Sequence, residues 1–177
     1  RTLKYLASRW WQIRAVVDVM DRLDPADLME TPGYVVVANI PYYITSVVIR
    51  HLLEARQPPG RVVLTLQKEV AERVCAGAGK MSLLALSVQA YGKPVIGTTI
   101  PAEAFYPPPK VDSAVLCIEV YSQPVFPADR LDKFFILIKA GFSQKRKTLR
   151  NALSGGLRIA PVESEELLSA AGIDPRR

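Results

Sequence analysis

A four-residue run, Asn39-Ile40-Pro41-Tyr42, directly follows a short apolar segment and holds side chains suited to chemistry on an amine. The exocyclic amine of adenine is a poor nucleophile because its lone pair is delocalised into the ring. The Asn39 amide oxygen and the Ile40 main-chain carbonyl could each accept one N–H of such an amine. That arrangement would favour a pyramidal nitrogen whose lone pair points at an electrophile. Acceptors fixed where positive charge develops lower the barrier to reaction.

The other two residues of the run suit the same task. Pro41 stiffens the loop and removes a competing N–H donor. Tyr42 offers a flat surface for a base that has been taken out of its stack. No strong base is needed, because the methylated amine sheds its proton readily. The alternative interpretation is a plain junction between a strand and a turn.

The run must be positioned by the segment that precedes it. Residues 34–39 form a continuous apolar stretch after a Pro-Gly turn signal, a pattern that predicts a central parallel strand covered on both faces. In open α/β sheets, ligands bind beyond the carboxyl ends of strands, which is where Asn39 would lie. A helix should follow to about Arg56, with Thr45 and Ser46 as candidate N-caps.

Strand and helix patterns continue to alternate up to residue 121, which predicts an α/β sheet. The expected strands are 61–67, 95–100 and 113–121, and the expected helices are 68–75 and 81–91. After the breakers of 122–127 the pattern becomes helical. We expect an amphipathic helix ending at Phe142, a basic helix over 143–153 that ends at Gly155-Gly156, and a last helix over 163–171. The sequence therefore predicts an α/β unit over residues 1–122 and a small all-helical unit over residues 123–177.

Positive charge is concentrated in the helical part. The chain has 23 Lys and Arg against 17 Asp and Glu, for a net charge of +6. Residues 133–158 contain no acidic residue and seven basic ones, namely Lys133, Lys139, Lys145, Arg146, Lys147, Arg150 and Arg158. A localised basic patch is typical of proteins that bind polyanions, although a solvated helix face has the same composition. Lys145, Arg146, Lys147 and Arg150 are the candidate phosphate contacts, and such binding would depend steeply on salt.

Two classes of function are excluded. The two cysteines, Cys75 and Cys117, and the single histidine, His51, are too few for a zinc site, so we expect no metal. No stretch approaches the roughly 18 to 20 uninterrupted apolar residues that span a bilayer, so we expect no membrane-spanning segment.

Four blocks of the sequence resemble the ribosomal RNA adenine N6,N6-dimethyltransferases, and they occur in the same order. They are residues 39–46 (Asn-Ile-Pro-Tyr-Tyr-Ile-Thr-Ser), 67–73 (Gln-Lys-Glu-Val-Ala-Glu-Arg), 105–113 (Phe-Tyr-Pro-Pro-Pro-Lys-Val-Asp-Ser) and 142–151 (Phe-Ser-Gln-Lys-Arg-Lys-Thr-Leu-Arg-Asn). The macrolide-resistance methyltransferases share the first block. Their proline loop is less similar, and they lack the Gln-Lys-Arg-Lys-Thr-Leu-Arg block.

The resemblance implies a Rossmann-like class I methyltransferase sheet and S-adenosylmethionine as methyl donor. It implies two adjacent adenines near the 3′ end of small-subunit rRNA as substrate, and the assembling small ribosomal subunit as partner. We expect a cytoplasmic monomer.

The resemblance also implies roles for individual residues. Asn39 and the Ile40 carbonyl would hold the adenine amine, and Asn39 would also border the cofactor. Tyr42 would stack on the target base, with Phe105 packing on its other side. Asp18 matches the position that contacts the cofactor's adenine, although a surface carboxylate at a strand end is the alternative.

The sequence departs from the family before Asp18, where no glycine-rich turn is present. Both ends look truncated, so only part of the methyltransferase sheet is expected, and we expect this chain alone to bind S-adenosylmethionine poorly. Residues 77–80 (Gly-Ala-Gly-Lys) do not fit a phosphate-binding loop and are expected to form a turn. Two other functions stay open: a non-catalytic RNA-binding or ribosome-assembly module, and an adenine methyltransferase that acts on another RNA or on DNA.

Overall fold

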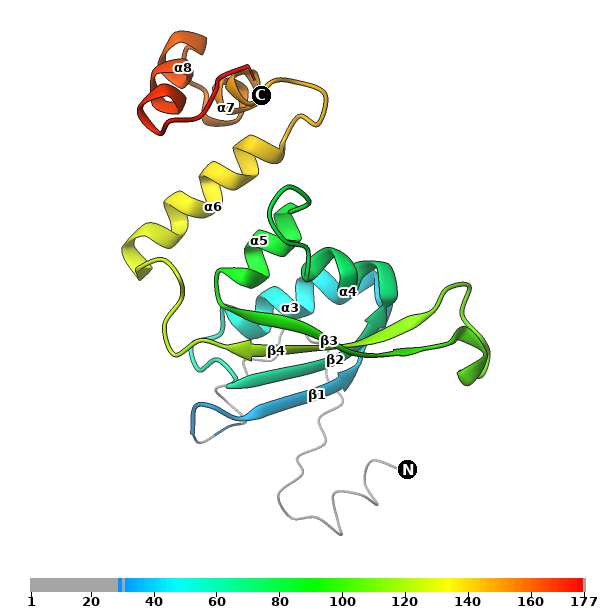
Figure 1. Cartoon of the computed structure of the whole chain (residues 1–177). Coiled ribbons are helices and arrows are strands. Elements are labelled where there is room, and N and C mark those ends of the chain that lie inside the picture. Colours follow the sequence, from blue (N-terminus) through cyan, green and yellow to red (C-terminus); the bar gives the residue numbers. More distant parts are fainter. Residues whose placement is uncertain (1–28, 30, 177) are drawn as a thin grey trace.

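The computed structural model describes residues 29 and 31–176, which form a mixed four-stranded sheet with the order β1-β2-β4-β3 (Figure 1). The strands are β1 (Val35–Asn39), β2 (Arg61–Gln67), β3 (Gly92–Ile100) and β4 (Ser113–Val120). β1 and β2 are parallel, whereas β4 runs antiparallel to both β2 and β3. The predicted α/β class is therefore confirmed, and all four expected strands are present.

Helices cover one face of this sheet and then lead away from it (Figure 1). The covering helices are α3 (Thr45–Leu53), α4 (Lys68–Val74) and α5 (Leu83–Gln89). The helices beyond the sheet are α6 (Ala128–Phe142), α7 (Leu149–Leu157) and α8 (Pro161–Ala170), and two short 3-10 turns are η1 (Tyr42–Ile44) and η2 (Ala102–Ala104). The change from mixed to purely helical structure after β4 agrees with the change of pattern in the sequence.

The main core lies between the sheet and the covering helices. Alternate residues of β2, namely Val62, Leu64 and Leu66, are fully buried, as the two-residue period of a strand requires. They pack in one cluster with the apolar face of α3, including Ile49 and Leu52. This packing fixes where β2 and β4 end relative to α3, and therefore positions the loops at those ends.

The prediction that residues 34–39 are covered on both faces is wrong for the described structure. β1 is an edge strand there, because it pairs only with β2 in the described sheet. Its residues alternate in exposure, and Val37 is 76% exposed. The run is apolar on both faces, but only the face carrying Val36 and Ala38 packs against the core formed by described residues.

The predicted continuous basic helix over 143–153 is also wrong. α6 ends at Phe142, residues 143–148 form a turn, and α7 begins at Leu149. The Thr148 hydroxyl caps α7 by accepting from the Asn151 N–H at 3.4 Å. The two glycines do not end α7 either: they lie inside it, and Arg158 caps its C-terminus in the left-handed conformation, with φ 59°.

The position of Gly156 against α6 explains why a helix contains this glycine. A Cβ at Gly156 would lie 2.5 Å from both Cα and Cβ of Ala140. Ala140 is 3% exposed, and it packs with Leu153 and Leu168 in the small core of the helical part. The glycine therefore permits the close approach of α7 to α6.

We expect Gly156→Ala to lower the free energy of unfolding by about 1–3 kcal/mol, because the added methyl group must push the two helices apart. Gly155→Ala is the matched control, since its Cβ would meet only the flexible end of Gln144. The control should be neutral or up to about 1 kcal/mol stabilising, as alanine is in helix interiors. Urea denaturation followed by circular dichroism measures both; equal effects of the two changes would contradict this explanation.

No helix within residues 29 and 31–176 is both long enough and apolar enough to cross a membrane.

Candidate functional site

Asn39 is the last residue of β1, where it pairs with Thr65 of β2 in the parallel ladder. Its side chain lies on the exposed side of the strand. Among the described residues, the Asn39 carboxamide has no hydrogen-bond partner, so its oxygen is available to a ligand. The next residue, Ile40, has a buried side chain, which anchors the chain as it leaves the sheet.

The turn that follows Asn39 is closed by hydrogen bonds. The Pro41 carbonyl accepts from the Ile44 N–H at 3.2 Å, and the Tyr42 carbonyl accepts from the Thr45 hydroxyl at 3.1 Å. Thr45 is 4% exposed and is the first residue of α3, whose N-cap is Ile44. The prediction that Thr45 or Ser46 is the N-cap of this helix is therefore wrong. The Thr45 hydroxyl instead donates to the Tyr42 carbonyl in η1. These bonds hold the main chain of Tyr42.

A hollow of about 360 Å³ lies beside this turn. One wall comes from the end of β1 and from η1, and the other comes from the connection between β3 and β4. Its lining residues are Asn39, Ile40, Pro41, Tyr42, Phe105, Tyr106, Pro107 and Pro109. The five residues predicted to be catalytic thus meet at one place, although Phe105 is distant from the others in sequence. The volume falls in the range of small-molecule sites.

The sequence analysis missed one residue, Ser113, that contacts a side chain of this site. The Tyr42 hydroxyl lies 2.7 Å from the Ser113 hydroxyl, at hydrogen-bond distance, and Ser113 is fully buried at the start of β4. The only sequence signal for a role of Ser113 was that it is the last residue of the block 105–113, which resembles the family. A pairing between residues 71 positions apart cannot be read from a local pattern.

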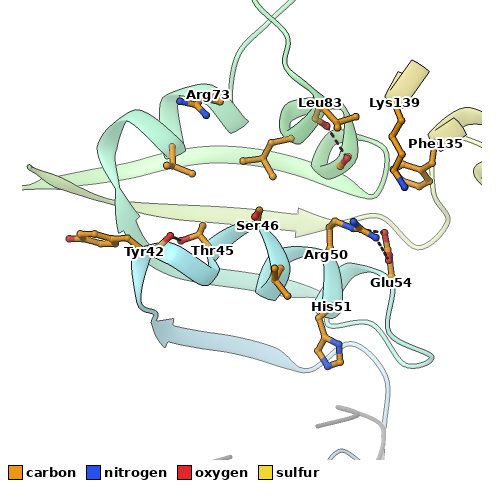
Figure 2. Close-up of a pocket in the computed structure, with 14 residues that line it drawn as sticks. Tyr42, Thr45, Ser46, Arg50, His51, Glu54, Arg73, Leu83, Phe135 and Lys139 are labelled. Atoms are coloured by element: carbon orange, nitrogen blue, oxygen red, sulfur yellow. Dashed lines mark hydrogen bonds and ion pairs between the residues drawn. The ribbon is translucent and has the colours of Figure 1, made fainter. Parts of the chain in front are cut away.

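A larger hollow of about 710 Å³ runs along α3 to α6, and Tyr42 lines it as well (Figure 2). Phe135 and Lys139 line it from α6, and Arg50 and Arg73 line it from the covering helices. Figure 2 shows Arg50 paired with Glu54, at 3.2 Å. Arg73 pairs with Glu69 at 2.6 Å, so both guanidinium charges are already balanced by a carboxylate.

Metal ligands and reactive thiols do not gather near these hollows. Within the described part of the chain, no three His, Cys, Asp or Glu residues could together hold a metal ion. Both cysteines are free, and burial raises the pKa of the Cys75 thiol. A raised pKa keeps the thiol protonated and unreactive at neutral pH.

The predicted RNA-binding residues lie on the helical part. Lys145, Arg146 and Lys147 are exposed in the turn between α6 and α7. Arg150 lies on the first turn of α7 and pairs with Glu165 of α8 at 3.1 Å. Three of the four charges are thus presented to solvent, and the fourth is shared with a carboxylate. Asp18, the predicted cofactor contact, lies outside the described residues.

Comparison with known sequences gives consistent matches. The sequence model of the family "Ribosomal RNA adenine dimethylase" matches residues 12–175. A protein of Dehalococcoides mccartyi named "Ribosomal RNA small subunit methyltransferase A" is 47% identical over 160 residues, which are 90% of this chain and 55% of that protein. A protein of the same name from Desulfitobacterium hafniense is 41% identical over 169 residues, 91% of this chain and 60% of that protein. The chain therefore spans a little over half the length of these curated relatives.

Solved structures agree on the fold. The crystal structure of the 23S rRNA methyltransferase ErmE superposes with a TM-score of 0.73 at 23% identity, covering 99% of this chain and 69% of that one. A dimethyladenosine transferase from Plasmodium falciparum gives a TM-score of 0.65 at 28% identity, covering 81% of this chain and 61% of that one. The predicted methyltransferase fold is thereby confirmed. With a family match over residues 12–175 and relatives more than 40% identical over most of its length, the chain belongs to the ribosomal RNA adenine dimethylase family.

Proposed function

We propose that this protein transfers methyl groups from S-adenosylmethionine to N6 of two adjacent adenosines near the 3′ end of small-subunit rRNA. The observation that carries the proposal is the hollow beside Asn39, where all five residues predicted from the sequence come together. The names of the relatives, which are small-subunit RNA methyltransferases, support the same substrate class.

Asn39 and Ile40 are the groups that act on the amine in this proposal. The Asn39 amide oxygen and the Ile40 carbonyl oxygen each accept one N–H of the adenine amine, which directs the nitrogen lone pair away from the ring. Positive charge would develop on the nitrogen as it takes the methyl group and the carbon–sulfur bond of the sulfonium breaks, and both acceptors would stabilise that charge. The alkylated nitrogen is positively charged and strongly acidic in that state, so it then releases its proton to water.

Tyr42 and Phe105 hold the base between them. They line the same hollow, one from η1 and one from the connection after β3. Both residues are partly exposed, so their rings can present a surface to a ligand. An adenine that has left its stack regains stacking contacts there, which offsets part of the cost of extrusion.

The described residues fit the acceptor side of this reaction and one edge of the cofactor site. The Asn39 carboxamide has no hydrogen-bond partner among the described residues. It lies at the carboxyl end of β1, and the carboxyl ends of strands are where ligands of α/β sheets bind. S-adenosylmethionine, when bound, supplies an electrophilic methyl group on a sulfonium. Asn39 borders both ligands in this arrangement, which makes it the residue most sensitive to change.

The turn between α6 and α7 is the proposed contact with the RNA backbone. Lys145, Arg146 and Lys147 are exposed on it and form no ion pair with another described residue, so they can reach phosphates directly. Contacts of this kind position an RNA but do not read its sequence. The assembling small subunit is the partner that we propose, with the protein acting as a monomer.

The test uses the protein encoded by the complete reading frame that contains this sequence. It is incubated with labelled S-adenosylmethionine and unmethylated small subunits, and the modified positions are mapped by primer extension. We expect label in two neighbouring adenosines near the 3′ end of the RNA. Label only in large-subunit RNA or in DNA would overturn the substrate, and RNA binding without any transfer would favour the non-catalytic assembly module.

A further inference from the structure

We infer that the first residue of β4 and the residue before it, Ser113 and Asp112, are positioning residues that set the distance between the two walls of the adenine hollow. The inference rests on the proposed function, and it extends that function to two side chains that do not line the hollow. Ser113 holds the wall that carries Tyr42, and Asp112 holds the wall that carries Phe105.

Ser113 fixes the orientation of the Tyr42 ring. The main chain of Tyr42 is held by Thr45 at one end of the side chain, through a 3.1 Å hydrogen bond. At the other end, the Tyr42 hydroxyl meets the Ser113 hydroxyl at 2.7 Å. A ring anchored at both ends cannot swing about its χ angles, so the stacking surface is in place before a base arrives. Without Ser113 only the first anchor remains.

Asp112 acts on the other lining segment, the connection between β3 and β4 that carries Phe105. Its carboxylate oxygen Oδ1 accepts from the Ala102 N–H at 3.1 Å, at the start of η2. The Ala102 carbonyl in turn accepts from the Phe105 N–H at 3.2 Å. Two successive hydrogen bonds therefore connect Asp112 to the residue that packs on the far side of the base.

The sheet makes the start of β4 a rigid platform for both walls. β4 lies between β2 and β3, and Ser113 pairs with Gln67 on one side and Ile100 on the other. The Asp112 carbonyl also accepts from the Lys68 N–H at 3.0 Å, which ties it to the first residue of α4. Two adjacent residues held in this way can fix both walls to within the small tolerance that catalysis requires.

The experiment measures steady-state methylation of small subunits by the complete protein and four test variants: Ser113→Ala, Tyr42→Phe, the double variant, and Asp112→Ala. Asp112→Asn is measured beside them as the conservative replacement. Each single change should lower kcat on the order of ten-fold and leave KM for the subunit within about two-fold. The double variant Ser113→Ala with Tyr42→Phe should be no worse than either single change, because both remove the same hydrogen bond. Asp112→Asn should recover most of the activity lost in Asp112→Ala, since an amide oxygen still accepts from Ala102.

Ser87→Ala is the matched control. Ser87 is also a buried serine, and its hydroxyl donates to the Leu83 carbonyl at 2.8 Å within α5. It should lower the melting temperature about as much as Ser113→Ala while leaving kcat unchanged. Wild-type kcat in Ser113→Ala and Tyr42→Phe, or additive losses in the double variant, would overturn the inference while the wild type still methylates. Absence of transfer by the wild type would instead overturn the proposed function, and this inference with it.

Discussion

Asn39→Ala is expected to lower the kcat of methyl transfer by about 100- to 1,000-fold in the complete protein, with RNA affinity within about two-fold of wild type. The magnitude is that of removing one fixed polar group which stabilises charge developing in a transition state. The exposed position of Asn39 at the end of β1 means that the shortened side chain leaves no cavity in the core. The loss should therefore fall on chemistry and not on folding. Single-turnover methylation and filter binding with the same RNA separate the two effects.

Gln123→Ala is a suitable control for that experiment. Like Asn39, Gln123 has a carboxamide side chain. It is exposed in the segment between β4 and α6 and does not line the hollow. Its replacement should change neither kcat nor RNA affinity. Methylation by Asn39→Ala at the wild-type rate would remove the proposed role of the carboxamide, whatever the behaviour of the control.

Replacing Lys145, Arg146 and Lys147 together by glutamine should weaken RNA binding by about 10- to 100-fold at moderate salt. The slope of log affinity against log salt should fall by about two to three, because three phosphate contacts and their released counterions are lost. Arg150→Gln should have a smaller effect, since its guanidinium is already shared with Glu165 at 3.1 Å. Titrations at several salt concentrations measure both quantities.

A second triple variant, Lys80→Gln with Lys93→Gln and Arg130→Gln, removes the same net charge from exposed positions elsewhere on the chain. It should reduce affinity only slightly, through the weaker long-range field. Equal losses in the two triple variants would show that net charge, and not the turn between α6 and α7, governs binding.

The local elements of this protein were predictable because their signals are local. The segments 61–67 and 34–39 were each identified as a strand from the sequence, with bounds within one residue of β2 and β1. The helix over α6 followed from apolar residues three and four apart. The candidate residues of the catalytic run were also found in the sequence, because their chemistry depends on residue type and on a position directly after a strand.

Errors arose where the outcome depends on a partner that is distant in sequence. Gly155-Gly156 was expected to end a helix, as glycine does when only the local chain is considered. In the structure α7 continues through both, because packing against Ala140 requires a residue without a side chain at Gly156. The basic helix was expected to be continuous, but Thr148 caps a new helix after a turn, and that turn exposes three of the four predicted RNA contacts.

The sequence by itself determined the strands, most helices and the chemical identity of the residues that would act on an adenine amine, since each depends on neighbours within a few positions. Only the tertiary structure decided that Phe105 lines the same hollow as Tyr42 and that the Ser113 hydroxyl lies at hydrogen-bond distance from the Tyr42 hydroxyl. Those relations depend on the order β1-β2-β4-β3, which brings the start of β4 next to the loop that follows β1. Strand order is fixed by the burial of the whole apolar face against α3, α4 and α5, a global free-energy minimum that no local pattern encodes.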